Sequence, residues 1–113
     1  MGRLCLSMGH ERIFLMEEEL AVCERQGRYT RLYHRYGQTD VRENLDAILR
    51  QTGRMQYCHQ SFLVDPARIF RLRRGECQVR MPDGSLMIVP VSKNHSEKLV
   101  KALYGQRNFT EIP

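Results

Sequence analysis

The side chains best suited to chemistry are four cysteines and four histidines, and two of them, Cys58 and His59, are adjacent. A catalytic thiolate needs a neighbouring imidazole or other cation that lowers its pKa. Adjacent residues of an extended segment point to opposite faces, so Cys58 and His59 would turn away from each other. A pair of Cys58 with His34 or His95 stays open, but we expect no catalytic residues.

The spacing of these residues also predicts neither a metal site nor disulfides. The cysteines at 5, 23, 58 and 77 include no C-x-x-C pair, and the histidines lack a motif such as H-E-x-x-H. No glycine-rich phosphate loop is present. We therefore expect a non-enzymatic protein without cofactors. If Cys58 were exposed among arginines, its pKa could fall and its oxidation could alter binding.

The charge distribution predicts a polyanionic partner. The formal net charge is +5, and 15 of the 18 cations are arginine. Residues 1–24 hold two arginines and five glutamates, a net charge of −3, whereas residues 25–113 hold sixteen cations and eight acids, a net charge of +8. The planar guanidinium of arginine binds phosphate oxygens and guanine with two hydrogen bonds. Four arginines at 68, 71, 73 and 74 are either phosphate contacts or a solvated strand edge.

The length of 113 residues predicts a single domain over 1–113. No apolar run approaches the roughly 20 residues that cross a bilayer. The first residues become polar too soon for a secretory signal. We therefore expect a cytoplasmic protein with no membrane partner.

Short strands dominate the predicted elements. Residues 29–36 alternate, with Tyr29 and Arg31 on one face, and end at a turn around Gly37. Residues 13–16 and 20–24 are apolar segments on either side of an acidic run, 17–19, that predicts a solvated turn. Residues 62–64 form another apolar segment. The runs 69–73, 77–81 and 86–89, joined by turns, predict an antiparallel meander in which Phe70 and Leu72 share a face.

Two helices complete the prediction. Asp40 and Glu43 resemble a capping box, which predicts a helix near 41–51 that ends at Gly53. Ser92 or Asn94 could cap a last helix whose apolar stripe ends at Gly105, followed by a tail over 106–113.

Two segments carry a family resemblance. Residues 58–65 read CHQSFLVD and residues 91–93 read VSK. Together they resemble the two best-marked stretches of the LytTR DNA-binding domain, a His-x-Ser-aromatic-hydrophobic-Val-Asn segment and a Val-Ser-Arg turn. Ile69, the Asp83-Gly84 turn and the loop at 27–30 match as well. The resemblance covers about residues 11–104.

The resemblance implies a mostly β fold of short antiparallel sheets with one or two small helices. It also implies a bacterial transcription regulator whose loops enter successive major grooves of double-stranded promoter DNA, typically at direct repeats. A homodimer on DNA would fit such sites. Carried over by position, with Arg31 added from the same strand face, the DNA-binding residues are Arg28, Tyr29, Arg31, His59, Gln60, Lys93 and Asn94.

Several positions depart from the family pattern and keep alternatives open. Gln60 stands where Arg or Asn is common, Lys93 replaces Arg, Arg28 replaces Asn, and Asp65 replaces Asn. Because these residues are altered, one alternative is a β-rich protein-interaction module that has lost promoter binding. A second alternative is RNA binding, because tyrosines interleaved with arginines can stack on bases. The sequence contains no segment that matches a receiver domain, and we expect either a stand-alone regulator or an excised domain. Asp65, just before Pro66, is expected to organise a turn.

Overall fold

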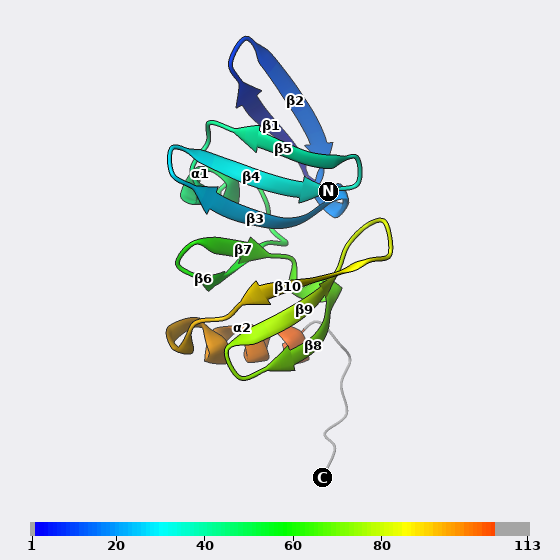
Figure 1. Cartoon of the computed structure of the whole chain (residues 1–113), viewed down its shortest axis with the longest axis vertical. Helices are drawn as coiled ribbons and strands as arrows, with labels where there is room; N and C mark the ends of the chain where they lie inside the picture. The colour runs from blue at the N-terminus through cyan, green and yellow to red at the C-terminus, as the bar shows by residue number, and fades with distance from the viewer. Residues whose placement is uncertain (1, 106–113) are drawn as a thin grey trace.

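The computed structural model describes residues 2–105, and the tail expected over 106–113 lies outside them. The described residues form ten strands, two α-helices and two 3₁₀ turns (Figure 1). The strands are β1 Arg3–Met8, β2 Glu11–Met16, β3 Leu20–Gln26, β4 Tyr29–His34, β5 Gly37–Val41, β6 Gln56–His59, β7 Phe62–Val64, β8 Ile69–Arg73, β9 Glu76–Arg80 and β10 Leu86–Pro90. The helices are α1 Leu45–Leu49 and α2 Lys93–Gly105, and the 3₁₀ turns are Glu17–Glu19 and Pro66–Arg68.

The strands form three antiparallel sheets. A central five-stranded sheet has the order β5-β4-β3-β7-β6, β1 pairs with β2, and a third sheet has the order β10-β9-β8. This arrangement confirms the mostly β prediction, including the meander of three late strands. The strand predicted over 29–36 is β4, which ends two residues earlier.

The central sheet buries apolar side chains on both faces. Leu32 and Leu63 join a core with the β1–β2 hairpin and α1. Val22 and Val64 join a second core with the three-stranded sheet and α2, where Leu99 is fully buried. Because both faces are covered, the positions of the loops at the strand ends are fixed by packing on two sides.

The first helix was predicted wrongly at both ends. Asn44, not Asp40, caps α1 by accepting a hydrogen bond from the Ala47 N–H at 2.8 Å. Asp40 lies in β5, and Gly53 lies beyond the helix, which ends at Leu49. The local motif was misleading because strand pairing extends through Asp40.

The acidic run is not merely a solvated turn. The Glu17 carboxylate accepts hydrogen bonds from the Thr52 hydroxyl and from the N–H groups of Gly53 and Gly2. These bonds, led by the one from Thr52, lower the pKa of Glu17. Glu17 therefore ties the start of the chain to the segment after α1.

Phe70 and Leu72 do not share a buried face. The register of β8 against β9 shifts between Ile69 and Arg71, so Ile69 and Leu72 pack against the core while Phe70 is 47% exposed. A bulge of this kind reverses the alternation after one residue.

The last helix begins directly after Ser92, one of the two predicted caps. No helix within residues 2–105 is long and apolar enough to cross a membrane.

Candidate nucleic-acid interface

Three predicted DNA-contacting segments lie along one edge of the molecule. The end of β3, next to the β3–β4 turn, is joined to the β6–β7 turn by a hydrogen bond from the Arg25 N–H to the Ser61 carbonyl at 2.9 Å. The start of α2 is joined to β6 by a bond from the Ser92 N–H to the Cys58 carbonyl at 2.8 Å. Figure 1 shows all three connections at the left of the molecule. Segments more than sixty residues apart in the chain thus form one row of loops.

A fourth segment belongs to this loop edge, and the sequence did not assign it. The Val91 N–H donates to the carbonyl of Gly75 at 3.0 Å, which places the β8–β9 turn beside the start of α2. Gly75 has a φ of +85°, which favours glycine and allows the tight turn. Arg73 and Arg74, immediately before it, are exposed. From the sequence alone, the arginines at 68, 71, 73 and 74 are either phosphate contacts or a solvated strand edge. For Arg73 and Arg74, the position at the loop edge favours phosphate contact.

The first loop presents its two candidates to solvent. Gly27 has a φ of +62° and opens the two-residue turn between Gln26 and Tyr29, as expected where glycine comes first in a hairpin turn. Arg28 is exposed, and Tyr29 is 52% exposed. Both side chains are therefore available to a partner.

Arg31 differs from the other candidates because it already has an anionic partner. Its guanidinium donates two hydrogen bonds to the Asp40 carboxylate on β5, at 2.9 and 3.3 Å. The bond to Arg31 lowers the pKa of Asp40. A DNA phosphate would have to compete with this carboxylate, so Arg31 is the weakest candidate in the set.

His59 is held in one orientation. The Ser61 N–H donates to His59 Nδ1 at 3.0 Å, and the ring packs edge-on against Phe62 with centroids 5.7 Å apart. Since Nδ1 accepts a hydrogen bond, the neutral imidazole carries its hydrogen on Nε2 and can donate from that atom. Gln60, next along the turn, is exposed.

Lys93 and Asn94 form the start of α2, and both are exposed. The Ser92 carbonyl accepts from the N–H groups of His95 and Ser96 at 3.1 Å, and the Ser92 hydroxyl lies 2.6 Å from His95 Nδ1. These contacts fix the first turn of α2 and so the position of Lys93.

Asp65 and Arg68 have structural roles. Asp65 is fully buried and caps the second 3₁₀ turn by accepting from the Ala67 N–H at 3.0 Å, as the predicted turn role requires. It also forms ion pairs with Arg54 at 3.4 Å and Arg68 at 4.0 Å. Arg68 donates to backbone carbonyls of Glu18 and Arg80. Arg68 is therefore neither a phosphate contact nor a solvated edge, but a link between the 3₁₀ turn that precedes β3 and strand β9 of the three-stranded sheet.

A redox role for Cys58 would require that its thiol be exposed among arginines, and the thiol is not exposed. It is fully buried, and this burial raises the pKa of its thiol to about 12. His34 and His95 are hydrogen-bonded to Thr39 and Ser92 respectively. All four cysteines are free thiols, and no group of three or more potential metal ligands occurs among residues 2–105.

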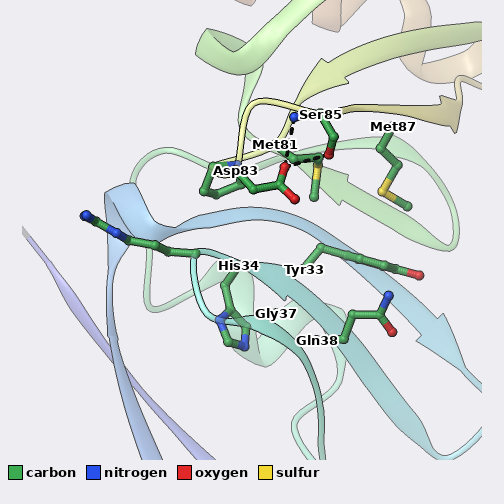
Figure 2. A pocket seen from close by; sticks show the side chains of 10 residues that line it. Tyr33, His34, Gly37, Gln38, Met81, Asp83, Ser85 and Met87 are labelled. Carbon is green, nitrogen blue, oxygen red and sulfur yellow. Dashed lines mark hydrogen bonds between the residues drawn. The ribbon is translucent and has the colours of Figure 1, made fainter.

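A hollow of about 350 Å³ lies at the other ends of the strands, between the β4–β5 and β9–β10 turns. Figure 2 shows Met81 and Met87 across it from Tyr33 and His34. The Tyr33 hydroxyl donates to Glu24 at 2.8 Å, and His34 Nε2 lies 2.8 Å from the Thr39 hydroxyl. Burial lowers the pKa of His34. Because these polar groups are bound within the chain, the hollow offers less to a ligand than the loop edge does.

Comparison with known proteins identifies a related family. Residues 10–104 match the family model described as the LytTr DNA-binding domain. Among solved structures, the fold is similar to the LytTr DNA-binding domain of a putative methyl-accepting/DNA response regulator from Bacillus cereus, with a TM-score of 0.68 and 18% identity, over 91% of this chain and 97% of that chain. No curated protein matches the sequence.

Proposed function

The chain belongs to the LytTR family of DNA-binding domains, and from that membership we propose that it is a non-enzymatic transcription regulator that binds specific promoter sequences through its loop edge. The observation that carries the proposal is the row of four hydrogen-bonded loops, from which exposed polar and cationic side chains project. We propose that these loops enter successive major grooves, and that the sites are direct repeats.

Each loop brings a group suited to one kind of contact. Gln60 can pair bidentately with adenine, and Lys93 can donate to the acceptors of guanine. His59 can donate from Nε2 to guanine N7 or O6, or to a phosphate oxygen. Arg28 and Arg74 suit phosphate oxygens, which position the protein on the duplex without reading sequence.

Selection from a random double-stranded DNA library tests this proposal and reports the site at once. We expect enrichment of one motif, occurring twice in the same orientation. The same protein is then titrated against the selected duplex and against single-stranded RNA of the same sequence. Failure to enrich any motif at low salt, or tighter binding of the RNA, would contradict the proposal.

Single substitutions test which residues read bases. Lys93→Ala and His59→Ala should each weaken binding of the selected site by about 1 to 3 kcal/mol and relax preference at one base position. Lys101→Ala, exposed near the other end of α2, is the matched control. Wild-type affinity and preference in the first two variants would remove those residues from the proposed interface.

A further inference from the structure

The β1–β2 hairpin has one satisfied edge and one open edge. On the outer side of β1, the Cys5 N–H donates to Gln51 Oε1 at 2.9 Å and the Cys5 carbonyl accepts from Gln51 Nε2 at 3.2 Å. The Ser7 N–H donates to the Glu43 carboxylate at 2.9 Å, and the Ser7 carbonyl accepts from the Arg42 N–H at 2.9 Å. No strand in the described part of the chain pairs with the outer side of β2. Figure 1 shows β2 on the side of the hairpin away from β5.

The register of the hairpin identifies the backbone groups at the open edge. Cys5 and Ser7 direct their N–H and carbonyl groups away from β2, so their partners Phe14 and Arg12 are non-hydrogen-bonded pairs of the ladder. In such pairs both strands direct their backbone groups outward. The N–H and carbonyl groups of Arg12 and Phe14 therefore point away from β1.

We propose that β2 is a dimerisation strand, which pairs antiparallel with β2 of a second copy of this chain around Ile13. In that register Arg12 lies opposite Phe14 of the second copy, and Phe14 opposite its Arg12. The outward groups of these residues then make four backbone hydrogen bonds. Two hairpins become one four-stranded sheet in the order β1-β2-β2-β1.

The side chains at this register complement each other. Phe14 is 56% exposed, and the Arg3 guanidinium lies 5.3 Å from the centroid of its ring. Arg12 projects from the same face of the hairpin as Phe14, because alternate residues of a strand share a face. Each Phe14 would thus gain the Arg12 of the other copy as a second cationic neighbour. The two Ile13 side chains would meet on the opposite face, where Ile13 already packs against the core.

This self-complementarity favours a second copy over an unrelated partner. A two-fold axis through Ile13 places a cation opposite an aromatic ring twice, without opposing like charges. The open edge also carries no proline or lysine to discourage pairing. The proposal does not depend on DNA binding, since β2 contributes none of the four loops of the loop edge. It concerns the free protein, because a two-fold dimer presents its two loop edges in opposite orientations and therefore does not match a direct repeat.

Sedimentation equilibrium without DNA tests the association. A two-strand interface is small, so we expect a reversible dimer with a dissociation constant of about 10 to 100 μM. Phe14→Lys places a lysine opposite Arg12 of the second copy in both cross-strand pairs and should abolish the dimer. Phe14→Glu places a carboxylate opposite the same arginine and should retain the dimer. Adding Arg12→Glu to Phe14→Lys should restore it. Urea unfolding of each variant checks that the monomer stays folded.

A cross-link tests the register. Residues at non-hydrogen-bonded antiparallel positions have Cα atoms about 4.5 Å apart, within the range of a disulfide. In a Cys5→Ser background, Ile13→Cys should form a disulfide dimer under mild oxidation, and Ser7→Cys, on the far strand, should not. A monomeric wild type at about 1 mM, equal association of Phe14→Lys and Phe14→Glu, or no cross-link at position 13 would each overturn the proposal. DNA affinity for a single half-site distinguishes this failure from failure of the proposed function.

Discussion

Removing Arg74 should change the salt dependence of DNA binding, whereas removing an arginine from the far edge should not. Arg74 is in the β8–β9 turn, and the next residue of this turn, Gly75, is hydrogen-bonded to Val91 beside the start of α2. Arg35 lies at the opposite ends of the strands, beside the hollow between the two far turns. Both arginines are exposed, and either change to glutamine lowers the net charge by one. The pair therefore separates a local phosphate contact from an effect of total charge.

The magnitude follows from the exposed cations at the loop edge. There are five of them: Arg25, Arg28, Arg73, Arg74 and Lys93. If each neutralises one phosphate of B-DNA, the slope of log K against log salt is about −4.5, and the affinity falls about 500-fold between 50 and 200 mM salt. Without Arg74 the slope becomes about −3.6, and the fall over the same range is about 150-fold.

Fluorescence anisotropy with a labelled duplex that contains the selected site gives both slopes. Arg74→Gln should bind every sequence more weakly by a similar factor, because a phosphate contact carries no sequence information. Arg35→Gln should keep the wild-type slope. Equal slopes for Arg74→Gln and Arg35→Gln would show that the interaction depends on net charge alone, and the reasoning about the loop edge would fail.

Three further predictions concern stability and reactivity. Asp65→Ala removes a buried cap and the anionic partner of Arg68 and should lower the free energy of unfolding by about 3 kcal/mol, whereas Asp65→Asn keeps the cap acceptor and should cost about 1 kcal/mol, both measured by urea titration. Burial lowers the pKa of His34, so the contribution of the neutral imidazole to the free energy of unfolding is complete above the ordinary pKa of 6.5 and is lost as the pH falls below it. His34→Gln should therefore make the free energy of unfolding depend less on pH in this range. Cys58, with a pKa raised to about 12, should react with iodoacetamide only on unfolding, while the partly exposed Cys5 reacts in the native protein. Labelling of Cys58 at the native rate of Cys5 would contradict its burial.

The strands could be predicted because their signals are local. Side-chain alternation and turn residues located β4 and the three late strands to within about two residues. The start of α1 could not, because Asp40 and Asn44 are both good caps, and the choice between them depends on Arg31, which holds Asp40 in β5. The bulge at Phe70 likewise depends on pairing with β9 rather than on its own residue type.

The candidate site could be predicted only for the segments that the family motif covers. The motif located the segments around His59 and Lys93, and the structure brings them together at one edge. The place of Arg74 could not be found in this way, because it follows from the bond between Gly75 and Val91, sixteen residues apart. Arg68 was indistinguishable from Arg74 by type or neighbourhood, yet it is bound to backbone carbonyls of Glu18 in the first 3₁₀ turn and of Arg80 in β9.

The acidic residues near the start of the chain affect the charge distribution through their position. Glu17 and Glu19 accept hydrogen bonds from neutral donors, which lower their pKa and keep them ionised without cancelling their charge. They lie before the first residue of β3, whereas the β3–β4 turn of the loop edge follows its last residue. At their end of the strands Arg35 lies close to Glu19 and partly balances its charge, whereas five exposed cations gather at the loop edge. A field with this polarity turns the loops toward a polyanion before contact, and it accelerates association most at low salt.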